Sequence, residues 1–163
     1  ILGSQWALAQ NGPNLGVLAA SEEIAAWDIS ISPDGNGLPE GSGTAVGGKS
    51  IYMEKCLVCH GQEGSGLLND RLAGGHGTLG GPAPIKTVGS YWPYATTIFD
   101  YVRRAMPYLQ PQTLSNEEVY ALTAYLLFLN GIIGEDEVMD ARTLPRVKMP
   151  NRDNFILAYP GEK

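Results

Sequence analysis

The stretch Cys56-Leu57-Val58-Cys59-His60 contains both cysteines of the 163-residue chain. Its C-x-x-C-H spacing is the attachment motif for haem c. Two thiols three positions apart can each add to one vinyl group of a single porphyrin, and the histidine that follows then lies under the iron as an axial ligand. We therefore expect one covalent haem c, held through Cys56 and Cys59, with His60 on the iron.

Three other interpretations of the cysteine pair have less support. A structural zinc site requires four Cys or His ligands, and the sequence offers only this motif and His76, without a second cysteine pair. A thioredoxin-like redox pair requires a preceding strand and a βαβ context, and neither pattern is present. A disulfide across two intervening residues would close a tiny loop and contribute little stability.

A sixth iron ligand has to come from elsewhere in the chain. Met106 lies in the segment A-M-P-Y-L-Q-P, residues 105–111, whose prolines prevent a helix and favour a rigid extended strap. We expect this strap to hold the Met106 thioether against the iron, which gives the raised reduction potential of His/Met haems. The alternatives that the sequence leaves open are Met149, His76 and an open sixth position.

Two helices are expected close to the motif. Residues 45–55 lead directly into it, with Tyr52 available for an interior face. Residues 94–105 have apolar side chains at helical spacing, and Asp100 and Arg104 form an i,i+4 pair.

The clearest helical pattern lies further along the chain. Ser115 and Glu118 form a capping box, apolar residues then recur at helical spacing, and Gly131 follows as a stop signal. The glycine-rich stretch 61–89 has no periodic segment, so we expect a loop that wraps the haem.

The domain organisation follows from these patterns. Ala7-Leu8-Ala9 fits the small-x-small pattern of a signal-peptide cleavage site. Residues 1–9 are therefore interpreted as the remnant of an export signal, with a disordered arm as the alternative, and the protein is expected in the periplasm. We expect a haem domain over 45–131, flanked by irregular arms over 10–44 and 132–163 that either wrap the core or dock to a partner.

Composition and charge narrow the classes of partner. The net charge of −6 disfavours nucleic acid, whose phosphates reward clusters of Lys and Arg. The same charge suits a basic protein partner, although it also serves solubility alone. No stretch approaches the roughly 20 apolar residues that a membrane span requires, so no span is expected.

The motif, the Met-Pro strap and the capped last helix together resemble a class I cytochrome c over residues 45–131. The resemblance implies an all-α fold of three to five helices around one haem. It also implies that the helix entering the motif crosses the last helix, where Gly48 and Tyr52 would meet Tyr125. Such cytochromes usually orient the haem histidine with the carbonyl of a proline, whereas residues 70–75 here read D-R-L-A-G-G. The orienting carbonyl is therefore unassigned.

A second resemblance covers nearly the whole chain. Residues 22–39, 86–97 and 144–153 are similar to the cytochrome subunit of Sox sulfur dehydrogenases. That subunit accepts electrons from a molybdenum-cofactor subunit, so the resemblance implies a sulfite or sulfur dehydrogenase as electron donor. It further implies another cytochrome c or an oxidase as acceptor. Sox subunits commonly carry two haem domains and this sequence has one C-x-x-C-H, which favours a separate one-haem acceptor.

Two functional hypotheses follow. The first is an electron-transfer protein, not an enzyme, because a His/Met iron has no free position for a substrate. The second is a haem enzyme or ligand sensor, which requires an open or labile sixth position. Four further residues could border the haem or its propionates, or serve as core aromatics and helix charges: Trp92, Tyr94, Arg103 and Arg104.

Overall fold

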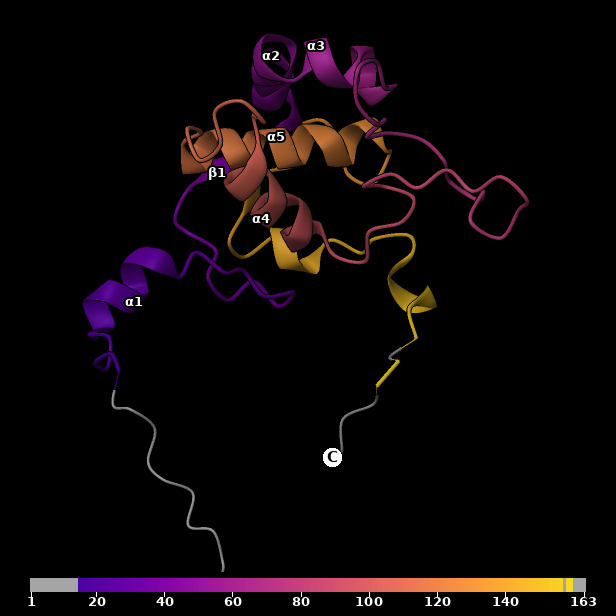
Figure 1. Ribbon diagram of the computed structural model, residues 1–163. Coiled ribbons are helices and arrows are strands. Elements are labelled where there is room, and N and C mark those ends of the chain that lie inside the picture. Colours follow the sequence, from indigo (N-terminus) through magenta and orange to yellow (C-terminus); the bar gives the residue numbers. More distant parts are fainter. Residues whose placement is uncertain (1–14, 157, 160–163) are drawn as a thin grey trace, which may run out of the picture.

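Two crossing helices organise the molecule (Figure 1). The computed structural model describes residues 15–156 and 158–159, and in it α2 (Ala45–Lys55) packs across α5 (Asn116–Leu129). Helix α4 (Ala95–Ala105) packs against another side of α5. The expected all-α architecture is confirmed. The remaining elements are short: the helices α1 (Ser21–Trp27) and α3 (Leu57–His60), the 3₁₀ helices η1 (Gln62–Gly64), η2 (Leu144–Arg146) and η3 (Arg152–Asn154), and the strands β1 (Ser42–Gly43) and β2 (Met139–Asp140).

Helix α5 forms the centre of the core and begins at the predicted capping box. The Ser115 hydroxyl accepts a hydrogen bond from the Glu118 amide at 3.2 Å, and the Glu118 carboxylate accepts one from the Ser115 amide at 2.8 Å. Every residue from Val119 to Leu127 is buried, so the helix is covered on all sides. It ends at Leu129 with Asn130 as the C-cap, and Gly131 has a φ of +64° that favours glycine.

The crossing of α2 and α5 depends on one glycine. A Cβ atom on Gly48 would overlap the backbone carbonyl of Ala121, so the two helices approach as closely as only glycine permits. One turn later the rings of Tyr52 and Tyr125 pack at 5.3 Å between centroids. The predicted meeting of Gly48, Tyr52 and Tyr125 is confirmed. Because the cysteine motif directly follows α2, the crossing also determines where this motif lies relative to α5.

Helix α4 begins one residue later than predicted. Tyr94 has extended backbone angles and serves as the N-cap, so the helix starts at Ala95. The predicted pair of Asp100 and Arg104 is present, with 2.9 Å between the guanidinium Nε and the carboxylate. Phe99 packs α4 onto the core, with its ring 4.4 Å from that of Tyr120.

Parts of both arms wrap the core. Strands β1 and β2 pair antiparallel, with Gly43 opposite Met139, and so join the two arms beside α5. The Tyr120 hydroxyl donates to the carbonyl of Pro39 at 2.9 Å, while Leu144 and Met149 are almost completely buried.

Helix α1 was not predicted, because the first arm was expected to be irregular. Acidic residues in its first turn were the signal for a helix. The proposed signal remnant over 1–9 lies outside the described residues. Within the described part of the chain, no helix is both long enough and apolar enough to cross a membrane.

The glycines of α2 provide a test of the crossing. We expect Gly48→Ala to lower the free energy of unfolding by about 1–3 kcal/mol, because its methyl group has to displace the α5 backbone. Gly47→Ala is the matched control: its Cβ would have nothing closer than 3.8 Å, and alanine favours a helix by about 1 kcal/mol. Chemical denaturation of the two variants measures both changes. Equal stabilities would contradict the close crossing.

Candidate haem site

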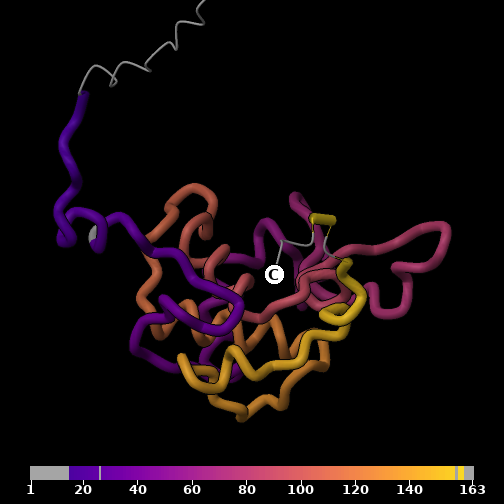
Figure 2. Tube along the Cα trace, turned by 90° about the horizontal axis from the view of Figure 1, so that it is seen from below, coloured from indigo at the N-terminus to yellow at the C-terminus, as the bar shows by residue number. Residues whose placement is uncertain are grey.

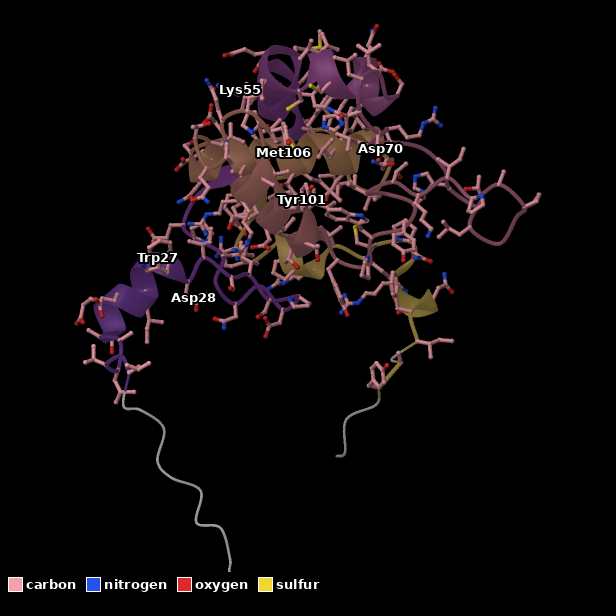
Figure 3. The ribbon with its side chains drawn as sticks, viewed as in Figure 1. Trp27, Asp28, Lys55, Asp70, Tyr101 and Met106 are labelled. Carbon is pink, nitrogen blue, oxygen red and sulfur yellow. The ribbon has the colours of Figure 1, made fainter. Side chains whose placement is uncertain are left out.

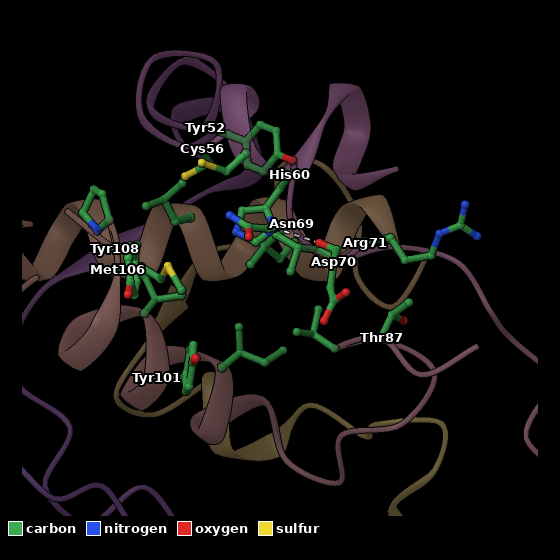
Figure 4. A pocket seen from close by; sticks show the side chains of 18 of the residues that line it. Tyr52, Cys56, His60, Asn69, Asp70, Arg71, Thr87, Tyr101, Met106 and Tyr108 are labelled. Carbon is green, nitrogen blue, oxygen red and sulfur yellow. Dashed lines mark hydrogen bonds between the residues drawn. The ribbon is translucent and has the colours of Figure 1, made fainter. Parts of the chain in front are cut away.

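The four residues predicted to hold the haem line one cavity of about 720 Å³. Cys56, Cys59 and His60 come from the end of α2 and from α3, while Met106 follows α4. Figure 4 shows the side chains of His60 and Met106 turned toward the same space from these different elements. Residues far apart in the sequence thus meet at one site.

The orientation of His60 is set by a carbonyl that the sequence did not identify. The Nδ1 atom of His60 lies 2.8 Å from the carbonyl oxygen of Asp70 (Figure 4). A carbonyl only accepts hydrogen bonds, so the ring carries its proton on Nδ1 and keeps the Nε2 lone pair free. Such an outer hydrogen bond fixes the ring and raises its basicity as a metal ligand. The Asp70 carbonyl thus occupies the place that the resemblance to class I cytochromes led us to expect for a proline carbonyl.

The loop that carries Asp70 is tied back to the motif by backbone hydrogen bonds. The Asn69 amide donates to the Cys59 carbonyl at 2.9 Å, and the Gly66 amide donates to the His60 carbonyl at 2.7 Å. Further along, the Leu72 amide donates to the Gly64 carbonyl at 2.8 Å. These bonds hold the Asp70 carbonyl beside the histidine ring without help from a proline.

Asn130 ties the same loop to the end of α5. Its side-chain oxygen accepts from the Gly74 amide at 3.0 Å, and its side-chain nitrogen donates to the Leu72 carbonyl at 3.1 Å and the Leu126 carbonyl at 2.8 Å. The residue is only 7% exposed, so its amide makes these hydrogen bonds largely shielded from water. No local sequence pattern marks Asn130 as part of this network, because its loop partners lie 56 and 58 positions away.

Burial shapes the environment of the motif. It raises the pKa of the Cys56 thiol to about 11, with a smaller contribution from the charge of Cys59. Burial likewise raises the pKa of Tyr52 to about 12, and the Tyr52 hydroxyl donates to the Gly61 carbonyl at 2.8 Å. A neutral phenol therefore fixes the backbone immediately after the histidine.

The structure separates the candidates for the sixth ligand. Met106 directly follows α4 in extended backbone, as the strap prediction requires, and it lines the cavity. Met149 is 1% exposed and packs in the hydrophobic core instead. His76 is exposed in the glycine loop and is not part of the cavity wall. Met106 is thus the one of these three that faces the space next to His60.

The rest of the wall fits a large apolar group. Buried side chains of α4 and α5, among them Ile98, Val102 and Leu126, form its floor. Leu67 and Leu68 line it as well, although they are 69% and 74% exposed. Apolar surface left open along a cavity is surface that a bound ligand covers. Volume, apolar lining and the thiol, imidazole and thioether donors together fit haem c.

Three cations at the cavity were not predicted. Lys55, Arg71 and Lys86 line it, although the Arg71 side chain extends outward in Figure 4. Of the four residues expected at the haem border, Trp92 does line the cavity.

The other three residues lie elsewhere. Tyr94 lies beneath the Arg152 guanidinium, 5.2 Å from the ring centroid, and Arg104 pairs with Asp100. Arg103 is not among the lining residues. Tyr94, Arg103 and Arg104 therefore fit the alternative interpretation, in which they are core aromatics and helix charges.

Comparison with known proteins agrees with this geometry. The family described as cytochrome C oxidase, cbb3-type, subunit III, matches residues 43–126. The thiosulfate dehydrogenase of Allochromatium vinosum is 28% identical over 120 residues, which cover 74% of this chain and 40% of that protein. The thiosulfate dehydrogenase of Psychrobacter arcticus is 28% identical over 103 residues, 61% of this chain and 31% of that protein. The chain thus spans less than half of these relatives.

A solved structure resembles almost the whole chain. The crystal structure of the sulfane dehydrogenase SoxCD from Paracoccus pantotrophus contains a chain that is 44% identical, with a TM-score of 0.83. The match covers 92% of this chain and 73% of that one. The likeness therefore extends beyond the haem domain into the arms, as the sequence resemblance predicted.

Replacement of Asn130 tests how the histidine is oriented. We expect Asn130→Ala to lower the free energy of unfolding by about 1–3 kcal/mol, because it leaves buried amide and carbonyl groups unpaired. It should also speed exchange of the His60 Nδ1 proton, since the Asp70 loop loses its tie to α5. NMR hydrogen exchange and denaturant titration measure the two effects.

Asn151 is the matched control. It is equally buried, and its side chain donates to the Tyr91 carbonyl at 2.8 Å, away from the histidine. Asn151→Ala should cost stability without changing the exchange of the His60 proton. An unchanged His60 proton in Asn130→Ala would show that the loop does not depend on the amide.

Proposed function

We propose a function from one premise: this chain belongs to the c-type cytochrome family of the cbb3-type cytochrome c oxidase subunit III, and it binds haem c. The protein is a periplasmic electron relay rather than an enzyme. It takes single electrons from a molybdenum-cofactor sulfite or sulfur dehydrogenase and passes them to another cytochrome c or an oxidase. The observation that carries this proposal is the meeting of His60 and Met106 at one cavity.

Each of the four predicted residues has its own part in holding haem c. Cys56 and Cys59 would anchor it as thioethers, and His60 Nε2 and the Met106 sulfur would be the protein ligands of its iron. Bound in this way, haem c supplies reversible one-electron chemistry. Asp70 and Asn130 keep the imidazole in one orientation, and the apolar wall excludes water. With both iron ligands supplied by the protein, the site would suit electron transfer and would leave no place for a substrate.

The donor is inferred from the relatives. The solved likeness is a sulfane dehydrogenase and the curated likenesses are thiosulfate dehydrogenases, so all three act on sulfur compounds by name. The identity of 44% with the SoxCD chain supports a molybdenum-containing sulfur dehydrogenase as the donor. The net negative charge of the chain suits steering toward a basic partner.

Replacement of Met106 tests the ligand set. We expect Met106→Ala to abolish the near-infrared sulfur-to-iron charge-transfer band of the ferric protein and to lower the reduction potential by on the order of 0.1 V, within the span of about 0.8 V set by axial ligands. Met53→Ala is the control, because Met53 is exposed and does not line the cavity. A wild-type protein that is high-spin and binds CO readily would favour the haem enzyme or sensor instead.

Rapid mixing tests the donor. We expect a reduced molybdenum-cofactor sulfite or sulfur dehydrogenase from the same organism to reduce the oxidised protein at least about tenfold faster than it reduces an unrelated cytochrome of similar potential. Electrostatic steering predicts that this advantage shrinks as salt is added. Stopped-flow absorbance of the haem measures both. Equal rates for the two cytochromes would refute the assignment of this donor.

A further inference from the structure

The chain between residues 15 and 28 stands apart from the haem domain. In Figures 1 and 2 the segment with α1 lies at the edge of the molecule, and in Figure 3 Trp27 and Asp28 lie well away from Met106 and Tyr101 at the cavity. This segment, which we call the N-terminal arm, contributes no residue to the haem cavity or the hydrophobic core. Its role is therefore not to hold the haem.

The N-terminal arm is apolar where soluble surfaces are usually polar. Val17 is 97% exposed, Leu18 is fully exposed, and Trp27 is 87% exposed. Val17, Ile24 and Trp27 together line a shallow open groove along the arm. Large apolar side chains gathered in one segment mark an interaction surface, and tryptophan is among the residue types that most often anchor one.

The arm is also purely acidic. Residues 1–48 contain five acidic side chains and no Lys or Arg, whereas the rest of the chain is nearly balanced. Glu22, Glu23 and Asp28 are exposed, and among the described residues no Lys or Arg lies within salt-bridge distance of them. The arm itself carries three of these acidic side chains, equal to half of the net charge of −6, next to its exposed apolar side chains.

We propose that the N-terminal arm is a docking segment for the electron donor. Trp27 and Ile24 insert into an apolar groove on the surface of the donor. Glu22, Glu23 and Asp28 pair with Lys and Arg side chains at the rim of that groove. The inference rests on the proposed function, because the donor is the molybdenum-cofactor dehydrogenase named there. The likeness to the sulfane dehydrogenase chain covers 92% of this protein, which is more than the haem domain alone, so at least part of the arms belongs to the shared architecture.

Two features favour the donor over other occupants. A second copy of this chain is acidic as a whole and carries the same acidic arm, so self-association brings like charges together. The solved relative of this chain is itself part of a sulfane dehydrogenase, which favours the donor over the acceptor. An arm bound to the donor keeps the relay at a high effective concentration beside its source of electrons, and it covers no part of the haem cavity, where both partners have to exchange electrons.

Paired variants test the arm. Trp27→Ser removes the apolar anchor, and a second variant combines Glu22→Gln with Glu23→Gln. The amide oxygen that replaces the Glu23 carboxylate can still accept the hydrogen bond from the Ala20 amide, so this variant removes charge alone. The matched controls are Ile156→Ser, at a side chain that is 92% exposed in the other arm, and Glu135→Gln with Asp136→Asn. All four variants should keep the wild-type haem spectrum and stability, because the changed side chains are exposed.

The probe is the dehydrogenase that reduces the wild-type protein, and the readouts are Kd by titration calorimetry and stopped-flow reduction. We expect Trp27→Ser to raise Kd at least about tenfold and the charge variant to flatten the salt dependence of Kd. Saturated electron-transfer rates should stay unchanged. Both control variants should bind like wild type.

The outcomes are separable. If the dehydrogenase reduces the wild type quickly and the arm variants bind as well as the controls, the docking arm is refuted and the proposed function stands. If the dehydrogenase neither binds nor reduces the wild type, the proposed function fails and the arm proposal fails with it. Sedimentation that shows a wild-type dimer dissociated by Trp27→Ser would assign the arm to self-association and overturn the proposal.

Discussion

The close approach of α2 to α5 is the constraint on which the site depends. Because Gly48 lets the two backbones nearly touch, Tyr52 can pack on Tyr125, and the end of α2 arrives directly above the apolar face of α5. The motif that begins at Cys56 is then held at the rim of a cavity floored by that face. A larger side chain at position 48 would push α2 away from α5 and would move Cys56, Cys59 and His60 away from the cavity floor together. The absence of a side chain at Gly48 therefore determines where the motif lies.

The histidine adds a second constraint, which is met by a network rather than by a single residue. Asp70 supplies only a backbone carbonyl, so its identity matters less than the position of its loop. That position depends on bonds to the motif itself and on the amide of Asn130 at the end of α5. Asn130 caps the end of α5, whose apolar face forms the cavity floor. The same helix therefore both lines the cavity and helps to orient the His60 ring.

The sequence allowed some of this to be predicted, for physical reasons that can be named. Local signals were sufficient for α5, whose capping box involves residues three apart, and for the motif of Cys56 and Cys59. They were insufficient for the Asp70 carbonyl, since any loop residue has one, and for Asn130, whose partners lie 56 and 58 positions away. The short helix α1 was missed because the glycines and prolines around it suggested an irregular arm. For Arg103 and Arg104 the sequence left a place at the haem and a role as helix charges both open, because charge alone does not indicate which face of a helix meets the cavity.

The division of charge and apolar surface along the chain suggests how the relay is built. A haem with both axial positions filled by protein has no chemical means of choosing a substrate, so any selectivity has to reside in the surfaces that bring partners to it. Here the haem domain is nearly neutral, while the segment before Lys49 carries the excess charge. In the proposed assignment, with recognition on the arm and with His60 and Met106 as iron ligands, the cavity is free to be optimised for one property, the reduction potential. The arm can then change partners in evolution without disturbing the iron, because no residue of the arm contributes to the wall that surrounds it.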